Sequence, residues 1–521
     1  NFIHPSSGKI HQTEMFYSGN DTWKFRFTGI KKGEWLYNTS SNDSELDGYS
    51  GNITITDSNN TGFLSHVGNK YALQDGDGTK RGFLLNIFQT DDSGPFKHTH
   101  ITSFTPNTSE KAYEYITYAK ERGFTAVYIM LNNNLHDFGA YGYDEHSSSD
   151  PDLQAFEILD IILSTARENN IRVYFWRWGD ESRKWTPIGI EGGINGIADE
   201  RVTRYFAARL GPVPGWSMGY GFDLYEWVST NELEEWSDYF YEKMGWKHLL
   251  SARSYNFSTP DNIISYSQED VEIDSSFSAS GYPSYQEILN DLSMDKNSPH
   301  LYEERNTLYR WDVDSEDTRR IMWRTAMAGG MGGWYGFMDE DPVWGSGSGY
   351  SNDNALKAHG IFWENHSLLD FVVNNSLSSE DNTRVLESYD KEKYIFYKEN
   401  ASSIQIDLRN MKSSKEARAL DTKKAYNETE IGILNSSEHI INLPYTSDWV
   451  VSIEFNASGF CGDSICNETE NCDDCPEDCG ECCGNGVCES SYGEDCPSCP
   501  SDCFDSGIEV CCNGTAYTGD C

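Results

Sequence analysis

The sequence predicts a (β/α)8 TIM barrel flanked by two β-sandwiches and followed by a disulfide-rich tail. Strand-like and helix-like segments alternate through the middle of the 521-residue chain, short turn-separated strands lie on either side, and all 14 cysteines fall at the C-terminal end. Alternating strands and helices indicate a parallel sheet, whereas short strands with frequent turns indicate antiparallel ones. The predicted domains are an N-terminal β-sandwich, the barrel, a C-terminal β-sandwich and Cys-rich repeats, over residues 1–64, 65–372, 376–456 and 461–521.

The two flanking β domains are predicted from alternation of side chains. Trp23, Phe25 and Phe27 recur at every second position near the N-terminus, and residues 52–56 alternate again. A period of two is typical of a strand with one buried face. Near the other end, the strand candidates are residues 393–397, 403–408 and 449–453.

The barrel is predicted from buried apolar runs separated by amphipathic helices. The first three strands are expected at residues 82–88, 124–130 and 171–176, with helices over 109–122 and 153–168 between them. The later strands are expected to begin near Gly215, His248, Ile273, His300 and Gly332. The later helices are expected over 199–210, 229–244, 284–293, 315–328 and 354–370, and the fifth helix, within 254–280, has the weakest pattern. A doubly wound open sheet is the alternative, but no glycine-rich phosphate loop follows the first strand.

The cysteines repeat in a pattern. Those at 461, 466, 472, 475 and 479 recur at 483, 488, 496, 499 and 503. An even number of cysteines in one short span favours disulfides over zinc, although two Cys-x-x-Cys pairs have ligand spacing. The expected disulfide-forming residues are Cys461, Cys466, Cys472, Cys475, Cys479, Cys482, Cys483, Cys488, Cys496, Cys499, Cys503, Cys511, Cys512 and Cys521.

Several features indicate a secreted or cell-surface protein. The sequence begins with Asn1, as expected after removal of a signal peptide, and Asn-x-Ser/Thr sequons are frequent outside the barrel. Only Asn107 and Asn256 lie in its long central stretch. The expected glycosylation sites are Asn20, Asn38, Asn42, Asn52, Asn59, Asn365, Asn374, Asn400, Asn427, Asn435, Asn456, Asn467 and Asn513.

Net charge and hydropathy limit the kinds of molecule that this protein is expected to bind. Acidic residues outnumber basic ones 83 to 40, for a net charge of −43, so nucleic acid and anionic membrane surfaces are unfavourable partners. No apolar run is long enough for a transmembrane segment. We also expect that the flanking β domains or the Cys-rich tail attach the protein to a cell surface or to further copies of itself.

Carboxylates follow two predicted barrel strands that are far apart in the chain. Asp223 and Glu226 come after the fourth strand, and Glu303 and Glu304 follow the apolar start of the seventh, beside Arg305. Strand ends of such a barrel meet at one mouth, and two carboxylates there are what hydrolysis of a glycosidic bond requires. We therefore expect Glu304, Asp223 and Glu226 to be catalytic. The alternative for each of them is an ordinary solvated acid on the protein surface.

Polar and aromatic residues at neighbouring strand ends are candidates for substrate binding. Trp176, Trp178 and Trp334 offer flat apolar faces for a sugar ring, although tryptophan also packs barrel cores. Asn132, Tyr220 and Glu303 could hydrogen-bond hydroxyl groups. His98, His100 and His136 match no metal-ligand spacing, so neither a metal nor a cofactor is expected.

Several stretches of the sequence resemble known protein families. Trp23-Lys-Phe-Arg-Phe27 resembles the N-terminal β-sandwich often fused to bacterial and archaeal glycoside hydrolases. The stretches 216–223, 299–305 and 322–336 resemble apiosidase-like members of the large retaining (β/α)8 glycosidase superfamily. That resemblance implies Glu304 as nucleophile and Asp223 or Glu226 as acid/base, although Tyr220-Gly221 stands where Asn-Glu is commonest. The Cys-rich tail resembles repeats on archaeal surface proteins.

The sequence thus predicts a secreted glycoside hydrolase that cleaves a poly- or oligosaccharide with retention of anomeric configuration. The main alternative is a non-catalytic, glycosylated cell-surface or structural protein that keeps the barrel. A carbohydrate-binding receptor is the third interpretation.

Overall fold

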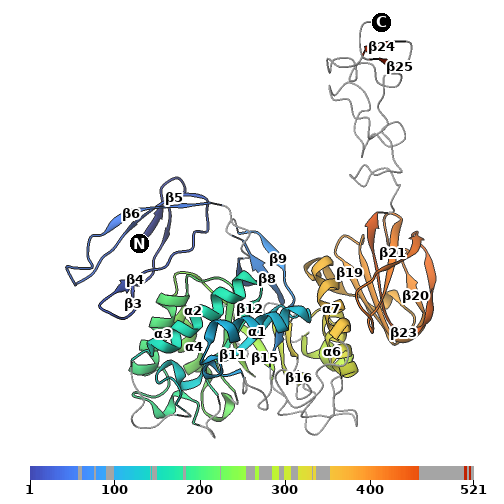
Figure 1. The fold of residues 1–521 in the computed structure, drawn as a ribbon. Helices are drawn as coiled ribbons and strands as arrows, with labels where there is room; N and C mark the ends of the chain where they lie inside the picture. Colours follow the sequence, from blue (N-terminus) through green and yellow to red (C-terminus); the bar gives the residue numbers. More distant parts are fainter. Residues whose placement is uncertain are drawn as a thin grey trace. The chain divides into compact units, whose positions relative to one another are not determined.

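A computed structural model of the chain forms two compact units, Asn1–Val373 with Thr422–Asn427, and Asn374–Asp421 with Glu428–Cys521 (Figure 1). The structure describes residues 1–56, 62–75, 78–89, 99–140, 142, 150–179, 184–222, 224–253, 264–268, 284–292, 299–306, 315–330, 332–335, 353–456, 510–512 and 515–517.

Eight parallel strands close into a barrel in the first unit, which confirms the predicted barrel. Each strand pairs with the next along the chain, and the last pairs with the first. In order, they are β10 (Leu85–Phe88), β11 (Ala126–Met130), β12 (Arg172–Trp176), β13 (Trp216–Gly219), β14 (Leu250–Arg253), β15 (Ile264–Gln268), β16 (His300–Asn306) and β17 (Gly332–Tyr335). Because all run parallel, their carboxyl ends lie at one mouth.

Helices follow most of these strands. They are α1 (Thr108–Glu121), α2 (Leu153–Glu168), α3 (Ile197–Leu210), α4 (Thr230–Lys243), α5 (Tyr285–Leu292), α6 (Ser315–Met327) and α7 (Asp353–Asn365). Local chemistry sets where two of them begin. Asp152 accepts a hydrogen bond from the Ala155 backbone N–H at the start of α2, and Ser229 and Glu232 form a capping box at the start of α4.

The sixth strand is where the sequence prediction was wrong. The strand was expected near Ile273, whereas β15 spans Ile264–Gln268, and residue 273 is not among the described residues. Both stretches place apolar residues at alternate positions, so a period of two could not decide between them. The predicted fifth helix falls largely outside the described residues. The first strand is also shorter than predicted, because Gly82 ends β9 (Lys80–Gly82) instead.

The N-terminal part of the first unit contains three small antiparallel sheets. β1 (Phe2–His4), β2 (Lys9–His11), β5 (Gly33–Asn38) and β6 (Ser50–Ile55) form one, in the order β2-β1-β5-β6. β3 (Phe16–Tyr17) pairs with β4 (Trp23–Lys24). β7 (Phe63–Val67), β8 (Lys70–Gln74) and β9 form the third, within the range where the barrel was expected.

The aromatic run at 23–27 is only partly a strand. β4 ends at Lys24, and the rings of Phe25 and Phe27 pack on Phe2 with centroids 5.5 and 4.2 Å away. Trp23 is exposed, so the alternation corresponds only in part to a half-buried aromatic cluster of Phe25 and Phe27 against the four-stranded sheet.

Contacts tie this N-terminal part to the barrel helices within the same unit. Arg26 donates two hydrogen bonds to the Asp160 carboxylate, at 2.6 and 2.7 Å, and Arg209 binds the same carboxylate at 2.8 Å. The His11 ring stacks on Trp246 with a centroid separation of 5.2 Å and an interplanar angle of 7°. Two cations sharing one half-buried carboxylate fix the position of α2 against both α3 and the N-terminal segment.

In the second unit, strands form a sheet in the order β19-β20-β23-β21-β22, and β18 (Phe371–Val373) ends the first continuous range of the first unit. The other strands are β19 (Thr383–Ser388), β20 (Tyr394–Asp407), β21 (Lys415–Asp421), β22 (Thr429–Leu434) and β23 (Glu438–Asn456). The register of β20 with β23 shifts between Lys398 and Ser403. Side chains from both halves of β20, such as Phe396 and Ile404, share one core. A bent continuous sheet therefore encloses the core, where two separate sheets were predicted.

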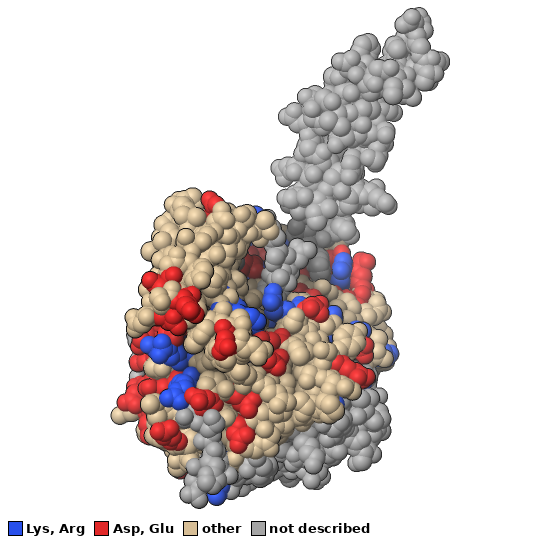
Figure 2. Space-filling model, turned by 60° about the vertical axis from the view of Figure 1, so that its left-hand side comes forward, with Lys and Arg blue, Asp and Glu red and all other residues tan. Residues whose placement is uncertain are grey.

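In the tail, the structure describes only the paired strands β24 (Val510–Cys512) and β25 (Thr515–Tyr517). The predicted disulfides and the repeat lie outside the residues whose side chains are described. Within the described part of the chain, no helix is both long and apolar enough to cross a membrane. Figure 2 shows acidic side chains scattered over the face in view, in keeping with the net charge of −43.

Stability should fall in mild acid because a buried histidine must stay neutral. His359 on α7 is 1% exposed, packs against Trp323, and burial lowers its pKa to about 3 from 6.5. The unfolded chain binds the proton between these values and the folded chain does not, so unfolding becomes easier as the pH falls from 6.5 towards 3.

We expect the His359→Leu variant to have a flatter dependence of stability on pH in this window. The slope should differ from that of the wild type by about 1.4 kcal/mol per pH unit, the value for one proton. Thermal unfolding at a series of pH values measures it. Equal slopes for the two proteins would show that His359 is not the group that titrates.

Candidate active site

Among the described side chains, aromatic residues of β11 and β12 line the inside of the barrel. The Tyr174 hydroxyl on β12 lies 2.6 Å from Ser251 Oγ on β14, so both side chains reach across the inside of the barrel. Trp176 lies two residues further along β12 and so faces the same side. Its ring centroid is 4.7 Å from that of Phe222 and 6.3 Å from that of Tyr128.

The absence of a side chain at Gly219, at the end of β13, leaves room for the indole ring of Trp176. The two residues are paired in the sheet, and a Cβ atom added to Gly219 would lie 2.1 Å from Trp176 Cζ3. No side chain fits there without moving the indole ring. The glycine in the fourth-strand motif is thus explained by the size of the residue on the neighbouring strand.

The stacking role predicted for two tryptophans does not fit this structure. Trp176 and Trp178 are each 0% exposed, and so is Tyr220. Trp178 packs parallel to the His136 ring, and Tyr220 packs on Trp227 and Trp236. Because they are fully buried, these rings offer no open surface to a sugar in this structure.

A buried arginine ties the loops after β11 and β12 together. Arg177, 2% exposed, donates to the Asn132 carbonyl oxygen at 2.8 Å and to Asp199 Oδ1 at 3.3 Å, and its Nη2 lies 3.0 Å from His136 Nε2. Its guanidinium carbon also sits 3.7 Å from the centre of the Trp178 ring. One cation therefore contacts the β11 loop, the β12 loop and the first turn of α3.

Burial and charge pairing shift the pKa values of Arg177 and Asp199 in opposite directions. Burial lowers the pKa of Arg177 to about 10, and the nearby Asp199 charge offsets part of that effect. Burial raises the pKa of the Asp199 carboxyl, which the Arg177 charge in turn lowers. Burial also raises the pKa of Tyr220 far above its ordinary value. The site is therefore poorly hydrated, and Tyr220 stays neutral.

Asn132 is held in an unusual backbone conformation beside this cluster. It has a φ of 48°, is fully buried, and its Nδ2 lies 3.4 Å from His100 Nδ1. An asparagine tolerates this left-handed region better than most residues. The hydroxyl-binding role predicted for Asn132 remains a prediction, since its amide is buried in this structure. Among the described residues, no group of three or more His, Cys, Asp or Glu side chains is arranged to hold a metal ion.

By their backbone positions, Glu226, Glu303 and Glu304 follow or lie on strands whose carboxyl ends open at the same mouth. Glu226 lies in η6 (Leu224–Glu226) after β13, and its side chain is exposed. Asp223 is not among the described residues. Glu303 and Glu304 lie on β16, whose side chains from residue 302 to 306 are not described, and the same holds for Trp334 on β17.

The pairing of β16 with β17 is irregular where the two glutamates lie. Tyr302 is opposite Gly333, and Asn306 is opposite Tyr335, so three residues of β16 occupy the space of one on β17. Strict alternation of side chains does not hold across such an irregularity. Bulges of this kind redirect side chains and are frequent next to active sites.

Sequence reasoning missed the residues that organise this mouth, namely Arg177, Asp199 and Gly219. One signal was present. Arg177 interrupts the apolar run Val173–Trp178, and a charged residue inside a buried run needs a buried partner. The identity of that partner, 22 residues further along, could not be read from the sequence.

Comparisons with known proteins agree with the barrel. Residues 1–42 match a family described as "Domain of unknown function (DUF5060)". No curated protein matches the sequence. Among solved structures, the chain is similar to a Bacteroides vulgatus protein that was assigned as a glycoside hydrolase, with a TM-score of 0.66 and 16% identity over 87% of this chain and 94% of that one.

Two further structures give the same result. One is a glycoside hydrolase with a TM-score of 0.54 and 14% identity, covering 75% of this chain and 97% of that one. The other is a family 5 glycoside hydrolase from Bacteroides vulgatus, with a TM-score of 0.54 and 13% identity over 76% and 94%. At such identities the likeness concerns the fold alone. The chain has a glycosidase-like fold.

Proposed function

We propose that this protein is a glycoside hydrolase whose active site lies at the mouth formed by the carboxyl ends of the barrel strands. The observation that carries the proposal is the position of Glu303 and Glu304, on β16, in the irregular stretch of pairing with β17. The loop with Asp223 and Glu226 follows β13, whose carboxyl end opens at the same mouth. The glycosidase-like fold supports this reaction class by analogy.

The proposed mechanism uses two carboxylates. Glu304 attacks the anomeric carbon while an acid from the β13 loop protonates the leaving oxygen, and the same acid then takes a proton from the water that releases the sugar. A proton donor works best in partly dehydrated surroundings. Glu226 is exposed in this structure and Asp223 lies outside the described residues, so both remain candidates for the proton donor.

Arg177 supports this mechanism indirectly. It connects the loops after β11 and β12 and leaves little freedom for their backbone. Loops held in one conformation at the mouth would orient a bound substrate, and orientation is a large part of catalysis.

Secretion, glycosylation and tail disulfides belong to the same proposal. Exposed side chains at Asn20, Asn38, Asn42, Asn52, Asn365, Asn400, Asn427 and Asn435 support attachment of glycans there. Among the expected sites whose side chains the structure describes, Asn374 is the least suited, because its half-buried Nδ2 donates to Glu387 Oε2 at 2.8 Å.

The alternative is a non-catalytic surface protein that keeps the barrel. One observation favours it, namely that Trp176 and Trp178, two of the three tryptophans expected to bind sugar, are fully buried. A panel of oligosaccharides and polysaccharides, assayed for release of reducing ends, separates the two. We expect at least one glycan to be hydrolysed, and proton NMR of the first product should show the anomeric configuration of the substrate. An absence of hydrolysis across the panel would favour the alternative, and an inverted product would exclude the retaining mechanism.

A further inference from the structure

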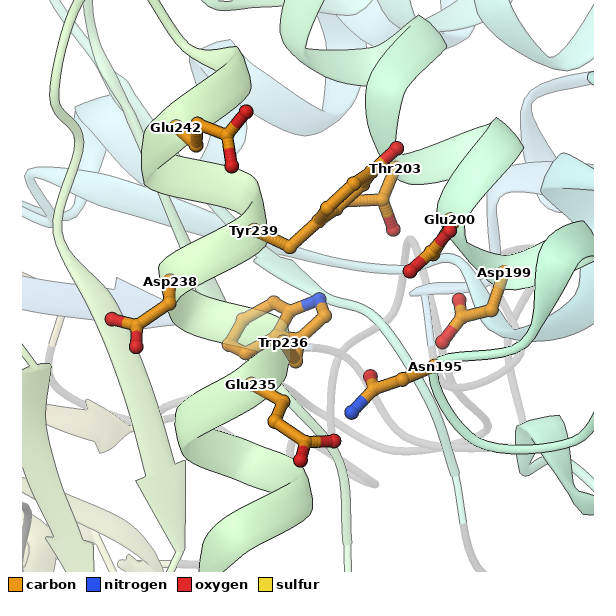
Figure 3. A pocket seen from close by; sticks show the side chains of 9 residues that line it. All are labelled: Asn195, Asp199, Glu200, Thr203, Glu235, Trp236, Asp238, Tyr239 and Glu242. Atoms are coloured by element: carbon orange, nitrogen blue, oxygen red, sulfur yellow. The ribbon is translucent and has the colours of Figure 1, made fainter.

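The hollow between α3 and α4 is lined by carboxylates and offers no open aromatic face (Figure 3). Its tryptophan, Trp236, is 3% exposed and packs on Tyr220 and Phe240. The buried Asp199 carboxylate beside it already accepts a hydrogen bond from Arg177. What remains is a solvated acidic surface.

The four-stranded sheet near the N-terminus, by contrast, has one buried and one open face; its strands β5 and β6 are drawn in blue in Figure 1. On β5, Trp35 is fully buried, while Glu34 and Leu36 on either side of it are exposed. The open face of an antiparallel sheet is typically polar. This one also carries the apolar side chains of Ile10, Ile3 and Leu36, which are 60, 38 and 44% exposed.

The register of the sheet places these three apolar side chains in line. Ile10 on β2 is opposite Ile3 on β1, and Ile3 is opposite Leu36 on β5. Residues that are directly opposite share a face, with Cβ atoms about 4.5–5.5 Å apart. We call these three residues the open-face row. A contiguous apolar surface with polar neighbours is typical of a surface that another group covers.

The open-face row ends at an expected glycosylation site. Leu36 is opposite Asn52 on β6, the last strand in the order of this sheet, and the Asn52 side chain is exposed on the same face. Asn52 Nδ2 donates to Glu34 Oε1 at 2.5 Å. A sugar attached to Nδ2 leaves one N–H on that nitrogen, so this hydrogen bond can persist. A glycan on Asn52 therefore begins beside Leu36, on the open face.

Such a glycan can reach the whole row. Ile10 lies three strands from Asn52, a distance of about 14 Å at the usual spacing of strands, which a short oligosaccharide spans. A pyranose ring has C–H groups on its faces and hydroxyl groups at its rim, so it can lie on aliphatic side chains with its hydroxyls in water. Covalent attachment keeps the sugar close to the row, so weak contacts suffice. A second copy of the chain is the rival occupant, and the net charge of −43 opposes it.

We propose that an N-linked glycan on Asn52 lies along the open-face row and covers Leu36, Ile3 and Ile10. The glycan thereby prevents this face of the sheet from packing against another molecule. This inference rests on the glycosylation that belongs to the proposed function, and it is independent of the glycosidase chemistry.

Hydroxyl-radical footprinting of the full chain, secreted from yeast with high-mannose glycans, tests the proposal. Radicals oxidise exposed side chains, and mass spectrometry of the digested protein gives the rate at each residue. The Thr54→Ala variant loses the sequon of Asn52 but keeps the asparagine and its amide. The matched control is Thr54→Ser, which changes the same exposed residue of β6 and keeps the sequon.

We expect Leu36 and Ile3 to be oxidised about twofold or more faster in Thr54→Ala than in the wild type, because a sugar ring in contact with one side of a side chain covers roughly half of its exposed area. Thr54→Ser should match the wild type. Ile433, which is 51% exposed in the second unit, should react equally in all three proteins.

The mass of the Asn52 peptide and the molar mass of the protein from light scattering separate the results that would overturn the proposal. An unglycosylated Asn52 in the wild type would overturn both this inference and glycosylation at this site. A glycosylated Asn52 with equal oxidation rates in the wild type and Thr54→Ala would overturn the contact alone. A dimeric wild type whose row stays protected in Thr54→Ala would show that a second copy covers it. Hydrolysis of the glycan panel is unaffected by any of these results.

Discussion

The Glu304→Gln variant should lose at least about 10³-fold in kcat on any glycan that the wild type hydrolyses, while keeping its fold. The amide has the shape of the carboxylate but is a poor nucleophile, so the covalent step has no route. Initial rates of reducing-end release on the best substrate of the panel measure the effect. Thermal unfolding should give an unchanged melting temperature.

The neighbouring Glu303→Gln variant is the matched control. It changes the same charge one residue away on β16, and we expect it to affect KM more than kcat, as for a residue that binds substrate. If Glu303→Gln abolished turnover and Glu304→Gln did not, the roles of the two residues would be reversed. Full activity of both variants would remove β16 from the catalytic site.

The second large effect concerns the buried pair of Arg177 and Asp199. Replacing Asp199 with Asn leaves a buried guanidinium without its counterion, which typically costs about 3–5 kcal/mol. The Arg177→Met variant leaves the Asp199 carboxylate uncompensated and should cost a similar amount. Urea unfolding followed by tryptophan fluorescence measures both free energies.

The double variant Arg177→Met/Asp199→Asn distinguishes a coupled pair from two independent contacts. Removing both charges leaves no buried ion, so the loss should be well below the sum of the two single losses. Additive losses would show that Arg177 stabilises the mouth through Asn132 and His136 alone. In that case the contacts of Arg177 with the two loops would still hold, but its charge pairing with Asp199 would not explain the stability.

Helices and the central strands could be predicted because their signals are local. The helix predicted over 153–168 matches the bounds of α2, where an apolar face at helical spacing follows an Asp N-cap. The strands at 126–130 and 172–176 are buried on both faces and, apart from Arg172, read as apolar runs. β15 could not be located, because short alternating stretches on both sides of residue 270 carry the same pattern.

The site was harder, because side-chain burial depends on residues from other strands. The sequence places Trp176 at a strand end, yet only the glycine on β13 and the ring of Phe222 decide that it is covered. The orientation of Glu303 and Glu304 depends in the same way on the pairing of β16 with β17. A strand read by itself predicts alternation, and the irregular pairing is a property of two strands that are about 30 residues apart in sequence.

Trapping of the covalent intermediate tests the central claim most directly. A set of 2-deoxy-2-fluoro glycosides with good leaving groups, matched to the sugar that the panel identifies, slows release of the sugar from the enzyme, and mass spectrometry of the digested protein locates the bound glycosyl group. We predict one added sugar on the peptide that contains Glu304. A label on any other acid, or steady turnover of the panel substrate with no labelled peptide, would contradict the account.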